Sequence, residues 1–416
     1  MSESFVNPKV GASCDPVDSW YRYYAGYSAG FVEQALKESG AAGLVLDPWN
    51  GTGTTTVVAA SMKVPAVGFD VNPALVVVAR ARLLGVGVWA SIAPLGDDVV
   101  AHATSVEQVD DPLQFWFTAE AAGWIRGLQQ SVHRLLVDSD IASQHMYETS
   151  SGMSTLAAFF YTVLFRTVRV LIAPRAGTNP TWWKRVEEAD RLDPNRVEIM
   201  DQFRKSATEL VAGLHRDNYD AGVDVRVALG DSRRLQLPEG TADIVISSPP
   251  YCTRIDYGIA TRPELAVLGA REKDLKLLRD YMVGTPTITG ETGVPDKWGT
   301  TAAAFLSGVS AHASKASSGY YTKYFHQYYA GMWTSLGEMR RVMTDGAPAI
   351  LVVQDNYYKD LHNDTAKILS EMAGARGFES VRRQDFPVVR NRASMNPRAR
   401  QYRSKASAVE SILVLR

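Results

Sequence analysis

The sequence predicts an α/β fold, with a mostly parallel twisted sheet, helices on its faces and a helical insertion. Two strand–turn–helix units follow one another in residues 44–85, and such repeats build parallel sheets. Strand-like apolar runs then stop and return only after residue 223, and the residues between carry apolar side chains at helical spacing. A chain of 416 residues is long enough for a sheet domain and an inserted subdomain.

The first part of the sheet domain is predicted to span residues 1–85. Residues 18–39 form an aromatic loop and then a helix, which ends at Gly40. A short buried strand over 44–47 is followed by a glycine-containing turn and a second helix. The same pattern recurs as a strand over 66–70 and a helix that begins at a proline, the residue favoured at the first helical position.

Residues 86–223 are predicted to form the helical insertion. Three of its segments, 114–136, 153–172 and 195–215, have apolar residues at helical spacing. A structureless connection of this length is improbable in a compact fold, so we expect these helices to pack as a subdomain. The second segment is the most apolar, but its two arginines favour a buried helix over a membrane span.

The second part of the sheet domain is predicted to span residues 224–416. Its elements are two strands, a helix, a loop rich in glycine, threonine and proline, a further helix and strand, a basic loop and a final strand. Their ranges are 224–232, 241–251, 262–281, 282–301, 324–343, 347–356 and 382–405, and the final strand follows residue 405. The alternation of strands and helices again favours a parallel sheet.

Composition restricts the class of protein. The formal net charge is −1, so any binding to a polyanion must come from local clusters of basic residues. Only two cysteines occur, Cys14 and Cys252, and they form no metal-ligand motif; this indicates a reducing compartment, no disulfide framework and no metal site. The polar start of the chain does not resemble a signal peptide. We therefore expect a cytoplasmic protein without a membrane segment.

Two motifs at the carboxyl ends of neighbouring strands predict a nucleoside site. In "DPWNGTGTT", residues 47–55, Gly51 and Gly53 allow the chain to turn tightly and approach a ligand at a helix N-terminus. In "GFDVNP", Asp70 ends the next strand, where a carboxylate can accept hydrogen bonds from a ribose diol. No GxxxxGK[ST] motif occurs, so a nucleoside triphosphate is not favoured. An ordinary strand–helix turn and a helix-capping aspartate are the alternatives.

A third motif, "SSPPY" at residues 247–251, follows a strand of β-branched residues. Two successive prolines lack N–H groups and have little conformational freedom, so they hold the chain in a rigid corner. The Pro249 carbonyl and the Ser248 hydroxyl can accept hydrogen bonds, and Tyr251 offers a flat face. This set suits a planar aromatic amine. The alternative is a surface turn.

Together these motifs resemble those of the S-adenosylmethionine-dependent DNA amino-methyltransferases, which methylate cytosine N4 or adenine N6. "DPWNGTGTT" matches their glycine motif, "GFDVNP" their acidic second strand, "GDS" at 230–232 their adenine-contacting loop and "SSPPY" their amine-gripping motif. "YYAGYSAGF" is similar, less closely, to their methionine-binding segment. The resemblance covers residues 18–85 and 224–416. It implies a Rossmann-like methyltransferase fold, S-adenosyl-L-methionine as cofactor and DNA as substrate.

The resemblance also implies roles for individual residues. Asp47 and the glycine turn would hold the methionine part of the cofactor, Asp70 the ribose and Asp231 the adenine amine. The implied cofactor-binding residues are Tyr27, Asp47, Trp49, Asn50, Gly51, Gly53, Thr54, Asp70, Asn72, Asp231 and Ser232. The implied catalytic residues, which would grip the target base, are Ser248, Pro249, Pro250 and Tyr251.

The first residue of the amine-gripping motif predicts the target base. Serine, here Ser248, is typical of the family's cytosine-N4 enzymes, whereas Asp or Asn is typical of its adenine-N6 enzymes. We expect direct in-line methyl transfer to N4 of a flipped-out cytosine, with adenine N6 as the alternative. Cys252 resembles the nucleophile of the carbon-5 enzymes only superficially, because Tyr251 separates it from the prolines, and we expect it to be a packing residue. The same chemistry on RNA, a small-molecule N-methyltransferase and a non-catalytic nucleoside-binding subunit are further alternatives.

The insertion interrupts the family's usual motif order and leaves the target-recognition region open. The candidates are residues 175–185, where basic residues alternate with two tryptophans, residues 314–329, and the Arg-rich loop 382–405. A packed loop is the alternative for the first and a solvated loop for the last. The expected nucleic-acid contacts are Trp182, Trp183, Lys184, Arg254, Arg390, Arg392, Arg398, Arg400 and Arg403. The resemblance further implies a partner, a cognate restriction endonuclease or another defence-system subunit.

Overall fold

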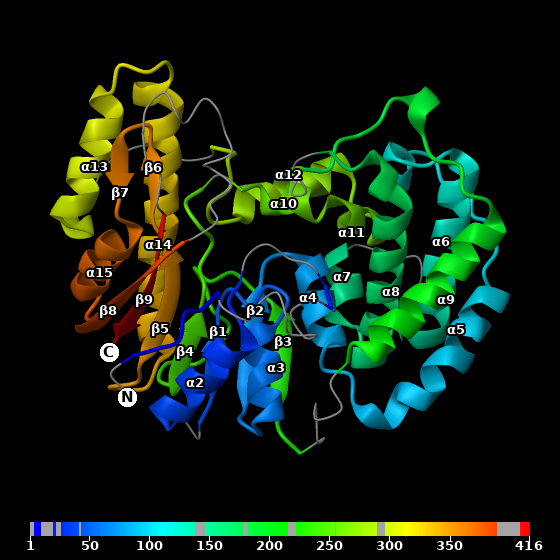
Figure 1. Cartoon of the computed structure of the whole chain (residues 1–416), viewed down its shortest axis with the longest axis horizontal. Coiled ribbons are helices and arrows are strands. Elements are labelled where there is room, and N and C mark those ends of the chain that lie inside the picture. Colours follow the sequence, from blue (N-terminus) through cyan, green and yellow to red (C-terminus); the bar gives the residue numbers. More distant parts are fainter. Residues whose placement is uncertain are drawn as a thin grey trace.

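The computed structural model describes residues 4–9, 20–21, 26–40, 43–137, 146–177, 182–214, 222–253, 255–288, 296–388 and 408–416. Their centre is a seven-stranded sheet of order β3-β2-β1-β4-β5-β9-β8 (Figure 1). The strands are β1 (Val45–Asp47), β2 (Ala66–Asp70), β3 (Val225–Leu229), β4 (Ile244–Ser247), β5 (Ala349–Gln354), β8 (Ser380–Pro387) and β9 (Val409–Leu415). Strands β3, β2, β1, β4 and β5 are parallel to one another, and β9 is antiparallel to both of its neighbours, β5 and β8. The predicted α/β fold with a mostly parallel sheet is confirmed.

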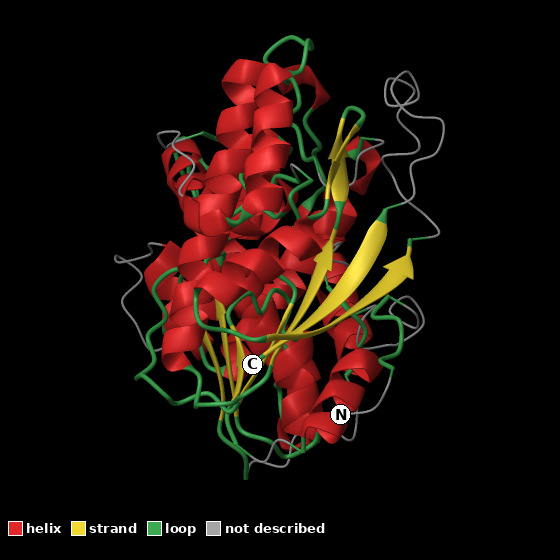
Figure 2. Cartoon of the chain, turned by 90° about the vertical axis from the view of Figure 1, so that its left-hand side faces the viewer, coloured by secondary structure: helices red, strands yellow, loops and turns green. Residues whose placement is uncertain are grey.

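Both faces of the sheet are covered by helices. These are α2 (Ala29–Ser39), α3 (Thr54–Ser61), α4 (Pro73–Ala81), α13 (Thr300–Ala311), α14 (Thr322–Val342) and α15 (Thr365–Ala375). Successive strand residues point to opposite faces. Val45 and Ile244 therefore share a core with α2 and α3, whereas Leu46 and Val245 share one with α14 and α15. Figure 2 shows the helices on both sides of the twisted sheet.

Helix ends near the carboxyl edge of the sheet follow local sequence rules. The Ser28 hydroxyl accepts a hydrogen bond from the Phe31 N–H and so caps α2, which ends at Gly40 in the left-handed conformation, with φ 63°. The side chain of Asn72 caps α4 by accepting a hydrogen bond from the Ala74 N–H, and Pro73 takes the first helical position. The strand bounds 66–70 and the start of the helix at Pro73 agree with the prediction.

The predicted insertion is helical where the structure describes it. Its helices are α5 (Ile92–Ala101), α6 (Ala119–Leu136), α7 (Met146–Ser151), α8 (Thr155–Ile172) and α9 (Arg196–Ala212). Of these, α7 and α8 pack on α4, whereas α5, α6 and α9 pack on α8 or on one another, and together they form the right-hand part of Figure 1. Thr155–Arg175 is apolar and long enough to cross a membrane, but 67% of its most apolar window is buried inside the fold. α8 is thus the core helix of the insertion.

Buried ion pairs fasten the insertion to the sheet domain. Arg126 pairs with Asp111 at 2.9 Å and also donates hydrogen bonds to the carbonyls of Ala266 and Val267. Arg169 of α8 pairs with the fully buried Glu264. Residues 264–267 belong to the short helix α11, which precedes α12, one of the helices that lie above the sheet in Figure 1. The insertion and this part of the sheet domain therefore share one core.

Two predicted elements differ in the structure. The helix expected over 262–281 is split into α11 (Arg262–Val267) and α12 (Glu272–Tyr281), because Gly269 between them has φ 80°, a conformation that ends a helix. The basic loop expected over 382–405 begins as strand β8, which pairs with β9 up to Pro387. Arg383 of β8 forms ion pairs with Asp364 and Asp385. Residues 389–407 lie outside the described part of the chain.

Several elements were not predicted. They are α13, α15, the helix α10 (Tyr257–Ala260) and a separate hairpin of β6 (Asn356–Tyr358) and β7 (Leu361–Asn363). 3₁₀ helices occur at Val86–Ser91, Pro112–Phe115, Ala173–Arg175, Glu188–Asp190 and Asp296–Trp298, and a π-helical turn at Ser317–Tyr321. Figure 1 shows α10 and α12 above the sheet, between the insertion on one side and α13 and α14 on the other.

Candidate active site

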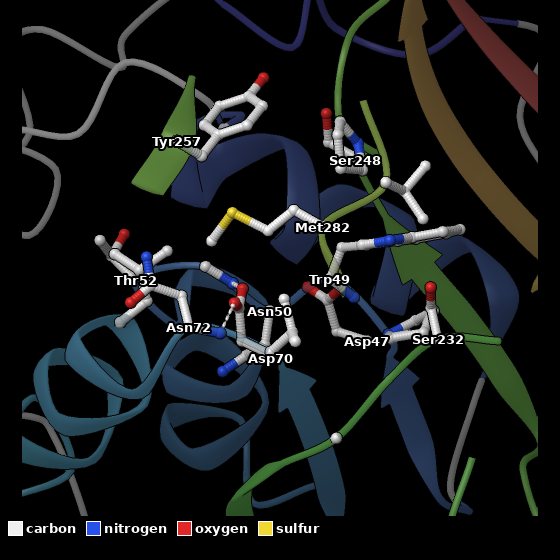
Figure 3. A pocket seen from close by; sticks show the side chains of 18 of the residues that line it. Asp47, Trp49, Asn50, Thr52, Asp70, Asn72, Ser232, Ser248, Tyr257 and Met282 are labelled. Carbon is white, nitrogen blue, oxygen red and sulfur yellow. Dashed lines mark hydrogen bonds between the residues drawn. The ribbon is translucent and has the colours of Figure 1, made fainter. Parts of the chain in front are cut away.

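A pocket of about 830 Å³, counted to its open mouth, lies at the carboxyl edge of the sheet. Pockets in parallel sheets commonly lie at this edge, outside the ends of the strands. The sequence-predicted residues that line it are Tyr27, Asp47, Trp49, Asn50, Gly51, Thr54, Asp70, Asn72, Asp231, Ser232, Ser248 and Pro250. Gly53, Pro249 and Tyr251 are not among its lining residues. Figure 3 shows how side chains from separate strands converge on it.

The Asp47 carboxylate is held by several hydrogen bonds within the fold. It ends β1 and is 2% exposed. Its carboxylate accepts hydrogen bonds from the hydroxyls of Tyr27 (3.0 Å), Thr55 (2.6 Å) and Ser247 (2.5 Å) and from the Trp49 N–H (3.1 Å). Burial raises the pKa of Asp47, and these hydrogen bonds oppose the rise. Asp47 therefore joins α2's leading loop, β1, α3 and β4 at one point.

Asp70 closes the glycine turn. Its carboxylate accepts hydrogen bonds from the N–H groups of Gly51 (2.9 Å) and Asn72 (2.8 Å). Gly51 has φ 52°, which a residue with a side chain adopts only with strain. Burial raises the pKa of Asp70 to about 6, against the effect of its hydrogen bonds to the backbone. The carboxylate lines the pocket, and its ionised form can accept further hydrogen bonds from a ligand.

Two glycines have packing roles that the motif alone does not give. Gly53 caps α3 with φ 87°, and a Cβ there would lie 2.8 Å from the Cβ of Ala79. Gly53 therefore lets α3 and α4 approach each other. At Gly68 in β2 a Cβ would lie 2.3 Å from Cγ of Asn50, so this glycine makes room for the Asn50 side chain. Sequence reasoning missed Gly68. A glycine in the middle of a strand is a sign that another group packs closely against the backbone there.

The Asn50 side chain is buried beneath the turn. Its Oδ1 accepts a hydrogen bond from the Thr56 hydroxyl at 3.2 Å. Its Nδ2 is buried and has no hydrogen-bond partner among the described residues. A buried donor without a partner is rare and costs free energy.

In the "GDS" loop, the side chains of Asp231 and Ser232 are both bound to other side chains of the protein. Asp231 pairs with Arg233 at 2.7 Å, and Arg233 in turn donates a hydrogen bond to the Tyr281 carbonyl at 2.7 Å. The carboxylate of Asp231 lines the pocket but is shared with this arginine. The Ser232 hydroxyl hydrogen-bonds the Ser335 hydroxyl at 2.9 Å and thereby connects the pocket wall to α14.

The proline corner lies at the opposite wall. The Pro250 carbonyl accepts a hydrogen bond from the Tyr328 hydroxyl at 3.0 Å. The Ser248 Oγ is buried and makes no hydrogen bond of normal geometry to a described residue. Tyr251 is 8% exposed, and its hydroxyl donates a hydrogen bond to the carboxylate of Glu410. Burial and the Glu410 charge raise the pKa of Tyr251 well above its ordinary value, and the nearby Ser248 hydroxyl opposes the rise.

Residues of α10, of the last turn of α12 and of the segment directly after α12 also line the pocket and were not predicted. They are Tyr257, Tyr281, Met282 and Val283. Figure 3 shows the Met282 side chain reaching into the pocket between Tyr257 and Asn50. Met282 and Val283 begin the segment that the sequence predicts only as a loop rich in glycine and threonine. Their apolar character next to a helix end was the one available sign.

Cys252 lies next to this corner but in the apolar core. It is 2% exposed, and its carbonyl accepts a hydrogen bond from the Asn356 side chain. Burial raises the pKa of its thiol. A buried thiol of raised pKa is a poor nucleophile, so Cys252 is placed as a packing residue. Among the described residues, no group of three or more His, Cys, Asp or Glu side chains could hold a metal ion.

The nucleic-acid contacts expected from the sequence are described only in part. Trp182 is 42% exposed, but Trp183 is 8% exposed and lies against the Arg169 guanidinium, 5.5 Å from its ring centroid. Lys184 is exposed, and its carbonyl accepts a hydrogen bond from the Trp116 indole at 2.8 Å. Of these three residues, Trp182 and Lys184 are therefore exposed at the surface. The residues that lie outside the described part are Arg254, Arg390, Arg392, Arg398, Arg400 and Arg403.

Comparison with known proteins shows what this chain is similar to. No family model matches the chain. Over 289 residues it is 23% identical to the type II methyltransferase M.BsoBI of Geobacillus stearothermophilus, a match that covers 63% of this chain and 55% of that protein. The chain is thus similar to type II methyltransferases over part of its length. It is also 24% identical over 230 residues to the type II methyltransferase M.AvaI of Nostoc sp., which covers 50% of this chain and 47% of that protein.

The relationship agrees with the architecture. The chain spans about half the length of these relatives. A mostly parallel sheet, a pocket at its carboxyl edge and type II methyltransferase relatives together identify a Rossmann-like methyltransferase fold. The fold predicted from the sequence is confirmed.

The pKa of Asp70 yields the first testable prediction. As the pH falls from 7 to 5 the carboxylate takes up a proton near pH 6, and it loses its charge and one hydrogen-bond acceptor. We expect the affinity for S-adenosylmethionine to decrease by up to about tenfold per pH unit below 6. Isothermal titration calorimetry at several pH values measures this. Asp70→Asn should bind more weakly at pH 7 and show a much flatter profile; an equally steep profile in that variant would assign the proton to another group.

Proposed function

We propose that this protein is an S-adenosylmethionine-dependent methyltransferase that acts on an exocyclic amine in DNA, most specifically N4 of cytosine. One observation carries the proposal: a single pocket is lined by Asp47 and Asp70 of the nucleoside motifs and by Ser248 and Pro250 of the proline corner. A cofactor and a planar amine can therefore meet at one edge of the sheet. The type II methyltransferase relatives support methyl transfer as the reaction.

The residues of the pocket fit this cofactor. Asp70 offers a carboxylate for the ribose hydroxyls, and the turn at Gly51 brings backbone close to a ligand. The buried Asn50 side chain would support this turn from beneath, through its hydrogen bond with Thr56. Asp231 would hold the adenine amine while it remains paired with Arg233. When bound, S-adenosylmethionine supplies a methyl group attached to a positively charged sulfur.

The proline corner would prepare the amine. The exocyclic nitrogen of cytosine is a weak nucleophile because its lone pair is delocalised into the ring. The Pro249 carbonyl and the Ser248 hydroxyl accept hydrogen bonds from its N–H groups and so increase its amine character. Positioning of this kind is worth about 7–11 kcal/mol in favourable systems. The target base lies inside a duplex and would be flipped out at a cost of a few kcal/mol.

The proposed target base and the proposed DNA contacts are supported by fewer residues than the reaction itself. Cytosine is preferred to adenine because Ser248 stands first in the proline motif. Candidate DNA contacts are the exposed Trp182 and Lys184 of the insertion, whereas the Arg-rich segment lies outside the described residues. By analogy with type II systems, we further propose a cognate endonuclease as partner and action in the cytoplasm.

Nucleoside mass spectrometry tests the proposal directly. Unmethylated genomic DNA is incubated with the protein and isotope-labelled S-adenosylmethionine, digested to nucleosides and analysed. We expect labelled N4-methylcytosine. Labelled N6-methyladenine would move the target base while keeping the reaction. Labelled 5-methylcytosine, label in RNA alone, or no label with DNA would contradict the proposal. Asp70→Ala serves as the matched control that loses the cofactor.

A further inference from the structure

The N-terminal segment, residues 4–9, brings a lysine onto the stacking tyrosine. The Phe5 N–H donates a hydrogen bond to the Gln384 side chain at 2.8 Å, and the Pro8 carbonyl accepts one from the Ser28 N–H at 2.8 Å. These bonds fix the segment on both sides. The ammonium of Lys9 then lies 5.4 Å from the centroid of the Tyr251 ring. One face of that ring is therefore covered.

The Lys9 ammonium is held by two acceptors. It donates a hydrogen bond to the Gly26 carbonyl and lies 3.5 Å from Oε1 of Glu410. Gly26 also lines the cofactor pocket. The ammonium is thus at the junction between the cofactor pocket and the proline corner. Its side chain is 35% exposed, so it can reach solvent without the protein unfolding.

Glu410 is brought to the same place by the topology of the sheet. It lies on β9, opposite Gln354 at the carboxyl end of β5. Because β9 is antiparallel, its first residues stand at the edge where the proline corner begins. The Glu410 side chain is 2% exposed, and its Oε1 accepts the hydrogen bond from Tyr251. Its buried Oε2 makes no hydrogen bond to any described residue.

A carbonyl, a carboxylate and an aromatic face form a binding set for an N–H donor. An ammonium on a tyrosine face is attracted by the ring and by the anion. A planar base with an exocyclic amine offers the same features, N–H donors and a surface that stacks on the ring. Lys9 and a stacked base cannot occupy this face of Tyr251 at the same time. A buried carboxylate that lost Lys9 would need a replacement donor.

We propose that the target amine takes the place of the Lys9 ammonium, that one of its two N–H groups bonds Oε2 of Glu410 instead of the Ser248 hydroxyl while the other bonds the Pro249 carbonyl, and that Lys9 fills this slot only while DNA is absent. The inference rests on the proposed function and adds to it a residue that reads the amine.

Two substitutions with opposite expected effects test this. Glu410→Gln keeps the size of the side chain but removes the charge, and we expect kcat to fall about tenfold or more. Lys9→Met removes the competing ammonium. If the slot is filled nine-tenths of the time, the Kd for DNA should decrease about tenfold. Loss of general positive charge would weaken DNA binding instead, so the two causes have opposite signs.

The measurements separate this inference from the proposed function. Fluorescence anisotropy with S-adenosylhomocysteine and duplex DNA gives the Kd for DNA without turnover, and labelled methyl incorporation gives kcat. Lys37→Met, at an exposed surface lysine, is the matched control for charge. Cofactor affinity within about twofold of wild type shows that a variant is folded.

Wild-type kcat in Glu410→Gln, or unchanged or weaker DNA binding in Lys9→Met, would overturn the inference. If Glu410→Gln does not fold, Lys9→Met decides alone. Absence of methylation by the wild-type protein would overturn the proposed function first.

Discussion

Replacing Tyr251 with alanine is expected to lower kcat for DNA methylation about 100-fold or more and to change the Kd for S-adenosylmethionine less than about twofold. The structure supports this separation, because Tyr251 does not line the pocket around Asp70 and Gly51. Its contacts are instead with Glu410 and Lys9, on the side where the base would stack. Loss of the ring would leave the amine poorly positioned but the cofactor site intact.

The two halves of this prediction are measured independently. Labelled methyl incorporation into DNA gives kcat, and calorimetry gives the cofactor Kd. Tyr251→Phe is the matched control: it keeps the ring, loses the hydrogen bond to Glu410 and should retain more activity than the alanine variant. Equal losses of kcat and cofactor affinity in Tyr251→Ala would remove Tyr251 from the base side of the site.

Asp47→Ala is expected to destabilise the fold by about 2–5 kcal/mol and to abolish cofactor binding. Without the carboxylate, the buried Ser247 hydroxyl and the Trp49 N–H lose their acceptor. The hydroxyls of Tyr27 and Thr55 can still approach the Ile246 carbonyl, at 3.2 and 3.4 Å, which limits the loss. Urea denaturation measures the free energy of unfolding.

Asp70→Ala provides the comparison for this effect. Asp70 is only half-buried, and water can replace it as acceptor for the Gly51 and Asn72 N–H groups. Its loss should weaken cofactor binding with a much smaller change in the free energy of unfolding. If Asp47→Ala unfolded at the same urea concentration as wild type, the buried network around Asp47 would not be structurally important.

Local sequence rules predicted the cofactor half of the fold closely. The strand over 66–70 and the helix from Pro73 are formed by neighbouring residues, and their capping groups lie in the same few positions. Gly269 shows the limit of such rules, because an isolated glycine inside a helical pattern is often tolerated but here breaks the helix. Strand β8 was hidden for a different reason: its Arg383 forms ion pairs with Asp364, which is distant in sequence, and with Asp385 on the same strand.

The candidate site was predicted where its residues belong to strand ends. Asp47, Asp70 and Ser248 lie at one edge because the carboxyl ends of parallel strands meet there. Tyr257 and Met282 could not be found in this way, since they come from α10 and from the end of α12, which share a core with the insertion. Lys9 and Glu410 are near opposite ends of the sequence. The antiparallel position of β9 brings Glu410 to Tyr251, and the hydrogen bonds of residues 4–9 bring Lys9 there.

The position of β1 in the interior of the sheet, between β2 and β4, affects how the chain is made. β1 pairs with β2 within some twenty residues, but its other edge pairs with β4, and the Asp47–Ser247 hydrogen bond joins residues 200 positions apart. Ribosomes add about 5–20 residues per second, so β1 waits roughly 10–40 s for that partner. During this interval a nascent chain exposes an unpaired apolar strand edge, the form most prone to aggregation. Fragments that stop before β4 should therefore be insoluble or bound by chaperones.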